Sequence, residues 1–193
     1  LDDRELRARQ AEEGIAAAAG RSFAAVAEQL EGVYRNLGSR RRTGRRSAQS
    51  SRELISADLH MHTSHSYDCA TDPEALVDHC IAQGLGAIAI TDHNEVSGAQ
   101  AAAALGKPIT IIVGEEVKTT QGEVIGLFLK ERIEPGLDMG ETIAAIQEQG
   151  GLVYMPHPFD RLHTIPDAAT LLRHLEQIDI LEVYNSRLLF DSF

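Results

Sequence analysis

The chain has 193 residues, a formal net charge of −11 and a mean hydropathy of −0.18, values typical of a globular domain with an additional segment. No apolar run approaches the roughly 20 residues that span a bilayer, and no signal peptide is visible, so the composition argues against a membrane or exported protein. The two cysteines, Cys69 and Cys80, do not suggest a disulfide framework, and we predict a cytoplasmic location.

The first 38 residues have a helical pattern that is interrupted near Gly20. The following residues, 39–53, contain six arginines among Ser, Gly, Thr and Gln, and we predict an Arg-rich linker. An arginine cluster is alternatively an electrostatic patch for nucleic acid or a membrane surface. Because the chain that follows is strongly acidic, a broad nucleic-acid surface is disfavoured.

The stretch "RSFAAVAEQLEGVYRNL", residues 21–37, has apolar residues at three- and four-residue spacings, which predict one apolar helix face. It resembles the C-terminal end of GT-B-fold glycosyltransferases at Ser22, Phe23, Val26, Leu30 and Tyr34. This resemblance implies an upstream glycosyltransferase domain in a longer parent chain. The first residue, Leu1, and a last residue inside an expected helix also suggest a piece of a longer chain.

From residue 54 onward strands and helices alternate, which predicts a parallel sheet and possibly a barrel in a domain spanning 54–193. The first predicted helix, "DPEALVDHCIAQGL", has an expected capping box of Thr71 and Glu74 with Pro73 in its first turn. The predicted strands are "LISADLHMHT", "GAIAIT", "PITIIVGEEV", "GEVIGLFL", "LVYMP" and "DILEVYN".

Polar residues gather where these strands end, and the C-terminal strand ends of a parallel barrel open on one face. His60 and His62 are two residues apart, so on a regular strand both imidazoles point to one side. Imidazole and carboxylate ligands suit Zn, Mn or Fe, and paired cations can clamp a phosphate. The strand-end residues are His60, His62, Thr91, Asp92, His93, Asn94, Gly114, Glu115, Glu116, His157, Glu182 and Asn185.

Five ordered motifs together resemble the PHP (polymerase and histidinol phosphatase) superfamily: "DLHMHTSHSYD", "GAIAITDHN", "GEEVKTTQGEVIGLFL", "MPHPFD" and "ILEVYNSR". The resemblance implies a distorted (β/α)7 TIM-like barrel with two or three divalent metal ions (Mn, Zn or Fe). It also implies hydrolysis of a phosphate ester by a metal-bound hydroxide, without a protein nucleophile. The substrate would be a nucleotide, an oligonucleotide end or a small phosphorylated metabolite.

The resemblance assigns metal ligands position by position. His60 and His62 fall on ligands of a first metal, and Glu116 falls on the bridging carboxylate, with Glu115 as the second choice. His157 falls on a ligand of a second metal. Asp68 and His93 fall on ligands of a third, while Glu123 occupies a position where many members carry a metal-binding histidine.

Other polar residues have expected roles around these ligands. We expect Asp92 to orient an imidazole through its other nitrogen. Arg161 and Arg187 are candidate phosphate contacts, and His65 is either a substrate contact or a surface histidine.

The PHP pattern ends with a late Asp-x-His motif, which does not occur before Phe193. We therefore expect an incomplete barrel whose remaining ligands are supplied downstream. The alternative function is a non-catalytic or regulatory PHP module fused to a glycosyltransferase.

Overall fold

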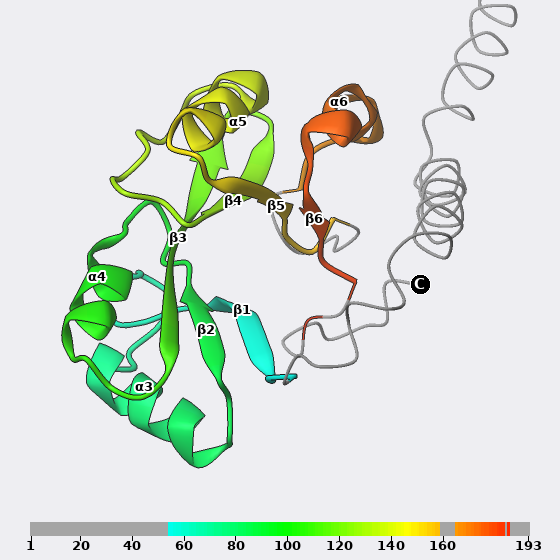
Figure 1. Cartoon of the computed structure of the whole chain (residues 1–193). Coiled ribbons are helices and arrows are strands. Elements are labelled where there is room, and N and C mark those ends of the chain that lie inside the picture. Colours follow the sequence, from blue (N-terminus) through cyan, green and yellow to red (C-terminus); the bar gives the residue numbers. More distant parts are fainter. Residues whose placement is uncertain (1–53, 159–164, 184, 186–193) are drawn as a thin grey trace, which may run out of the picture. The chain divides into compact units, whose positions relative to one another are not determined.

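The computed structural model describes residues 54–158, 165–183 and 185, which form a single sheet with flanking helices (Figure 1). The predicted helical segment 1–38 and linker 39–53 lie outside the described residues, so these boundaries stay predictions. The sheet has its six strands in chain order: β1 (Ala57–Met61), β2 (Ala87–Ile90), β3 (Thr110–Thr119), β4 (Gly122–Leu127), β5 (Leu152–Met155) and β6 (Ile180–Leu181).

The sheet is mixed, and the prediction of an all-parallel sheet is wrong at β4. β1, β2 and β3 are parallel, as are β5 and β6, whereas β4 is antiparallel to both β3 and β5. Only Thr120 and Gln121 separate β3 from β4. Such a short connection can join antiparallel neighbours only, because a parallel pair needs a crossover of a dozen or more residues. The described part of the chain is thus a partial α/β barrel.

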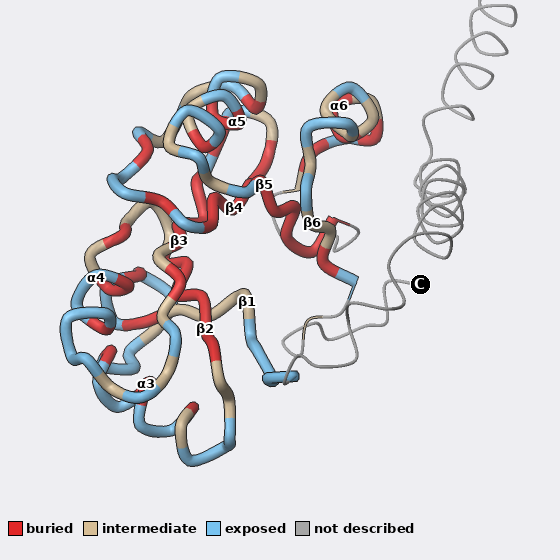
Figure 2. The backbone as a smooth tube through the Cα atoms, in the orientation of Figure 1, coloured by how far each residue is buried: buried red, intermediate tan, exposed pale blue. Residues whose placement is uncertain are grey.

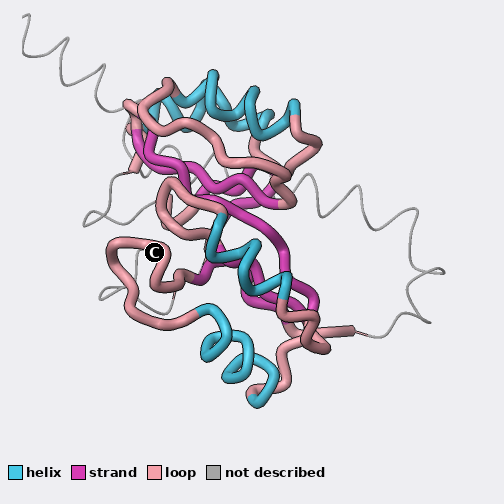
Figure 3. Tube along the Cα trace, turned by 90° about the vertical axis from the view of Figure 1, so that its left-hand side faces the viewer, coloured by secondary structure: helices cyan, strands magenta, loops and turns pink. Residues whose placement is uncertain are grey.

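The helices lie outside the strands (Figure 3). Helix α4 (Ser97–Ala104) packs on β3 and against α3 (Pro73–Ala82), while α5 (Met139–Glu148) packs on β4 and β5. Helix α6 (Ala168–His174) continues into a short 3-10 helix, Leu175–Gln177, that leads to β6. None of the helices in the described ranges is long and apolar enough to cross a membrane.

Side-chain caps fix where three of these helices, α3, α5 and α6, begin. The expected capping box of Thr71 and Glu74 is wrong, because Asp72 is the N-cap of α3 and its carboxylate accepts hydrogen bonds from the amides of Glu74 and Ala75. Pro73 follows at the start of the helix, as expected. Helix α5 has a complete capping box between Asp138 and Glu141.

The core lies on both faces of β2, whose four residues are all buried (Figure 2). Ile88 and Ile90 pack with buried residues of α3 and α4, while Ala89 packs with Ile125 of β4 and Tyr154 of β5. The continuous apolar run predicted for a buried parallel strand is confirmed, because helices cover one face and the other faces the partial barrel.

The pairing of β1 with β2 is irregular near the first histidine. Asp58 pairs with Ile88 and Met61 with Ile90, so β1 has one extra residue between these two pairs. This is the geometry of a β-bulge, which bends a strand and redirects its side chains. The alternation of side chains is therefore interrupted between Asp58 and Met61, yet His60 and His62 still point to one side, as predicted, because both imidazoles face Glu116.

Candidate metal centre

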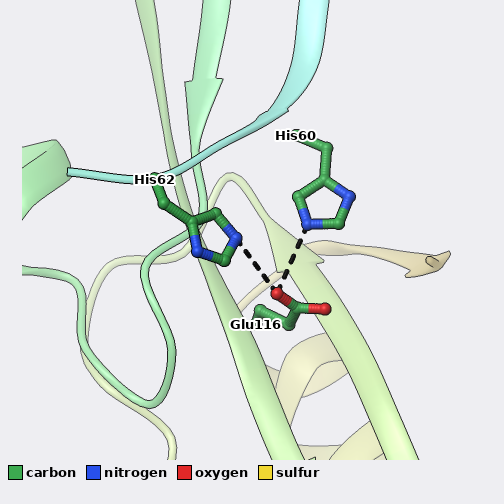
Figure 4. Close-up of side chains that lie close together, drawn as sticks. All are labelled: His60, His62 and Glu116. Carbon is green, nitrogen blue, oxygen red and sulfur yellow. Dashed lines mark hydrogen bonds and ion pairs between the residues drawn. The ribbon is translucent and has the colours of Figure 1, made fainter. Parts of the chain in front are cut away.

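Glu116 lies at the centre of the site, buried in β3 and surrounded by four imidazoles. Its Oε2 atom lies 3.3 Å from His60 Nε2, 3.1 Å from His62 Nε2 and 3.5 Å from His93 Nδ1. Figure 4 shows the first two imidazoles converging on this oxygen. The other oxygen, Oε1, lies 3.1 Å from His157 Nε2.

Strand order explains this convergence. His60 lies on β1 and His62 directly after it, while His93 follows β2 and forms an isolated parallel bridge with Glu116. His157 follows β5. The C-terminal ends of these parallel strands share one rim, and the β3–β4 hairpin adds the start of β4, with Glu123, to the same rim.

The seven predicted ligands form three groups whose candidate ligand atoms lie within 4.8 Å of one another. Two residues are shared between groups, since His62 and Glu116 each belong to two of them. Their assignment as ligands stays a prediction. The groups are His60, His62 and Glu116; His62, Asp68 and His93; and Glu116, Glu123 and His157.

The donor chemistry fits divalent metal ions. His62 Nε2 is buried and forms no hydrogen bond with the described residues, although Glu116 Oε2 is only 3.1 Å away. A buried nitrogen without a hydrogen bond is costly in a folded protein, and coordination to a cation would satisfy it. Mixed nitrogen and oxygen donors without thiolate are the ligands that Zn, Mn and Fe accept.

Charge interactions within the site shift the pKa values of its carboxylates and imidazoles. Burial would raise the pKa of Glu116, but its hydrogen bonds with His157 and His60 and the nearby His62 imidazole hold that pKa well below its usual value. Burial would lower the pKa of His60, but the hydrogen bonds and charges of Glu116 and Glu182 raise it to about 10. Without metal, the proton held on His60 therefore balances carboxylate charge, and a bound cation would replace that proton.

Asp68, which was predicted to share a metal ion with His93, lies beside the His62 ring as well. Its Oδ1 lies 2.9 Å from His62 Nδ1, and it accepts a hydrogen bond of 2.7 Å from the Ser66 hydroxyl. The Ser66 hydroxyl also accepts a 3.2 Å hydrogen bond from the His93 amide. The loop after β1 thereby connects all three members of the second group.

The expected role of Asp92 is wrong. Its carboxylate accepts hydrogen bonds from the Thr63 amide at 2.5 Å and from the Thr63 hydroxyl at 2.7 Å, rather than from an imidazole. Both residues are completely buried. Asp92 therefore joins the end of β2 to the loop that carries the β1 histidines.

The second-choice carboxylate, Glu115, lies outside the three groups. Successive residues of a strand point to opposite faces, and Glu115 Oε2 accepts a 2.7 Å hydrogen bond from the Ile133 amide. Of the three predicted substrate contacts, the described ranges include only His65. His65 is exposed and its Nδ1 lies 2.7 Å from Ser97 Oγ, while Arg161 and Arg187 lie outside the described ranges.

Two contacts of the site were missed from the sequence. The exposed Tyr67 ring stacks on His93 with a centroid separation of 4.8 Å, and no sequence signal identifies this pair. Glu182 was recognised as a strand-end acid without a role, but it lies 3.0 Å from His60 Nδ1. Burial would raise the pKa of Glu182, but the His60 hydrogen bond and charge lower it to about 2.

Six of the seven candidate ligands, all except Glu123, line an open cavity of about 430 Å³, together with residues that include Asp58, Cys69 and Asn185. This volume lies in the range of small-molecule sites, about 300–1,000 Å³. The site therefore combines a cluster of cation ligands with space for a small substrate group.

Comparison with known proteins establishes the family. The PHP domain model matches residues 58–178, and the chain belongs to the PHP domain family. The chain is 36% identical over 146 residues to uncharacterized protein MJ1587 of Methanocaldococcus jannaschii, covering 68% of this chain and 82% of that protein. It is 37% identical over 138 residues to uncharacterized protein MJ0417 of the same organism, covering 69% of this chain and only 54% of that protein.

A solved structure supports the fold. The crystal structure of a Bifidobacterium adolescentis protein, named as a candidate metal-dependent phosphoesterase, superimposes with a TM-score of 0.55 at 17% sequence identity. The similarity covers 68% of this chain and 78% of that one. The partial barrel described above is therefore an architecture that occurs in an experimentally determined protein.

Proposed function

We propose that this chain is a metal-dependent hydrolase of phosphate esters. The observation that carries the proposal is the convergence of four imidazoles on the buried Glu116 carboxylate in a PHP domain. The name of the Bifidobacterium adolescentis protein agrees with this reaction class. The three groups of donors support two or three divalent ions, with Zn, Mn and Fe as the candidates.

The chain's own residues would hold and shield the reacting groups. His60, His62 and Glu116 would bind one ion, Asp68 and His93 would contribute to another, and Glu123 and His157 to a further one. When bound, such ions lower the pKa of water and neutralise charge on phosphate oxygens. The buried Glu116 carboxylate, kept ionised by its imidazole neighbours, supplies a fixed negative charge between the groups.

The cavity is consistent with the predicted substrates, which are a nucleotide, an oligonucleotide end or a small phosphorylated metabolite. Arg161 and Arg187 stay predicted phosphate contacts. A cytoplasmic location, an upstream glycosyltransferase domain and a seven-stranded complete barrel are further proposals for the parent protein, resting on the sequence.

The test is a phosphate-release assay with nucleotides, oligonucleotides and sugar phosphates, each with Mn²⁺, Zn²⁺ or Fe²⁺. Both this chain and a form extended downstream should be assayed, with Glu116→Gln as the inactive comparison and Gln100→Ala as a surface control. We expect metal-dependent release that Glu116→Gln abolishes. Metal binding without release from any substrate by the extended form would contradict the proposal and favour a non-catalytic PHP module.

A further inference from the structure

We propose that Glu182 is a positioning residue that holds two candidate ligands, His60 and His157, in the orientation that metal binding requires. The proposal rests on the metal centre proposed above and adds a residue outside its three groups. Glu182 directly follows β6, is 8% exposed, and has each carboxylate oxygen directed at a different histidine.

The first contact determines which nitrogen of His60 faces the centre. Glu182 Oε1 lies 3.0 Å from His60 Nδ1, while His60 Nε2 lies 3.3 Å from Glu116. A neutral imidazole carries one proton, and a carboxylate beside Nδ1 keeps that proton on Nδ1. Nε2 is then left as the electron-pair donor, which is the usual arrangement of a histidine that binds metal.

The second contact holds the backbone of His157. This residue has a φ of 28°, which is unfavourable for a residue with a side chain. Its amide donates a 2.7 Å hydrogen bond to Glu182 Oε2, while its Nε2 lies 3.1 Å from Glu116 Oε1. Strained backbone persists at functional sites where neighbouring contacts stabilise it, and Glu182 supplies such a contact.

Glu182 is itself fixed on both sides. The hydroxyl of Tyr154, on β5, donates a 2.8 Å hydrogen bond to Glu182 Oε1. The side-chain amide of Asn185 donates a hydrogen bond of 3.3 Å to Glu182 Oε2. The Glu182 amide donates a 3.0 Å hydrogen bond to the Met155 carbonyl, which continues the β5–β6 pairing. The carboxylate is therefore anchored to the sheet before any cation binds.

The contacts make a selective prediction. Glu182 contacts one member of the first group and one of the third, whereas His62, Asp68 and His93 are held by the loop after β1. Loss of the Glu182 carboxylate should lower the affinity for the ions that His60 and His157 bind. Any ion bound by the second group should be affected less.

The experiment is calorimetric titration of the metal-free chain with Zn²⁺, using Glu182→Gln, Glu182→Ala, Asp68→Asn and, as the control, Gln100→Ala. The amide of Glu182→Gln has the shape of the carboxylate but only one acceptor, so one of the two histidine contacts is lost. Thermal unfolding followed by circular dichroism establishes that each variant is folded. Imidazole ¹⁵N spectra of the zinc-loaded protein report the proton on His60 Nδ1.

We expect Glu182→Gln to lower the affinity of at least one zinc ion about 10- to 100-fold, with loss of the His60 Nδ1 proton signal or of amide-exchange protection at His157. Gln100→Ala, a change at an exposed residue of α4 that contacts neither histidine, should retain wild-type affinity. Asp68→Asn should instead lower the affinity for an ion bound by the second group, His62, Asp68 and His93.

Unchanged zinc affinity and stoichiometry in folded Glu182→Gln would overturn the proposal. An equal loss in Gln100→Ala would also overturn it, because the loss would then not depend on the Glu182 carboxylate. These outcomes do not depend on phosphate release: zinc binding that is sensitive to Glu182, in a protein that hydrolyses nothing, contradicts only the proposed function. A wild-type chain that binds no zinc would overturn both.

Discussion

Glu115 and Glu116 are adjacent in β3 and both buried, yet their carboxylates have opposite surroundings. Glu116 faces four imidazoles, and those of His157, His60 and His62 keep its pKa low despite burial. Glu115 faces the other side, where its Oε1 has no hydrogen-bond partner among the described residues. Burial raises the pKa of Glu115 to about 7, despite the hydrogen bond from the Ile133 amide.

Replacing each carboxylate by an amide should distinguish the proposed metal ligand, Glu116, from the buried titrating group, Glu115. Glu116→Gln should abolish metal binding, while Glu115→Gln should leave it intact and change the pH dependence of stability. The raised pKa of Glu115 means that its contribution to stability is present below pH 4.5 and is lost as the pH rises through about 7. Between pH 5 and 8, the free energy of unfolding of the metal-free wild type should fall by up to about 3 kcal/mol relative to that of Glu115→Gln.

Denaturant unfolding of both metal-free proteins at several pH values measures this difference. A constant offset between wild type and Glu115→Gln would show that Glu115 does not titrate in this range. Retained metal affinity in Glu116→Gln would remove the central carboxylate from the proposed site.

Metal binding should release protons. Despite burial, the Glu116 and Glu182 interactions raise the pKa of His60 to about 10, so this imidazole carries an extra proton near pH 7, and Glu116 and Asp68 raise the pKa of His62. Cations bind the deprotonated ring, so zinc affinity should increase between pH 6 and 8. Calorimetry in two buffers of different ionisation enthalpy counts the released protons, and equal heats in both buffers would contradict this expectation.

The sequence predicted which side chains gather at the strand ends better than it predicted their surroundings. The histidines and carboxylates were identifiable because motif spacing and strand ends are local properties of the chain. The contacts of Glu182 with His60, and of Tyr67 with His93, join segments remote in sequence and depend on side-chain geometry. The same is true of Asp92, whose expected imidazole partner is replaced by Thr63.

At the scale of elements, strands were easier to predict than their directions. β3 and β4 were both expected, but the alternation of strands and helices elsewhere favoured a parallel sheet. The informative signal was the absence of a helix between them, since a two-residue connection requires an antiparallel pair. The bulge in β1 has no comparable signal, because it depends on how β1 pairs with β2.

The start of α4 gives a test of how elements hold the ligand loops. A Cβ at Gly98 would overlap the Asp92 carboxylate and the Thr63 hydroxyl. Gly98→Ala should therefore lower stability by about 1–3 kcal/mol and weaken zinc binding, because Asp92 and Thr63 connect the segments carrying His93 and His62. Gln100→Ala, exposed on the same helix, is the matched control. Equal stability of the two variants would show that this junction tolerates a larger residue.

At the scale of the whole domain, the candidate ligands come from β1, β3 and β4 and from the segments after β1, β2 and β5. Bound cations would therefore link elements throughout the partial barrel. At a free concentration of 100 times its dissociation constant, a single bound ion adds about 2.7 kcal/mol to the free energy of unfolding, which raises the melting temperature by roughly 5–10 °C. Thermal unfolding with Zn²⁺ and with EDTA measures this shift. Equal shifts in wild type and Glu116→Gln would show that zinc acts elsewhere.

The spread of the ligands along the chain also has a consequence during protein synthesis. Glu116 lies 56 residues after His60 and 41 residues before His157. At 5–20 residues per second, a ribosome would need roughly 5–20 s to pass from the first of these histidines to the last. During that interval the imidazoles at β1 lack their partners, and the nascent chain has no assembled centre to discriminate among cations. Metal selection would then occur after β5 has joined the sheet, from the cations available where folding is completed.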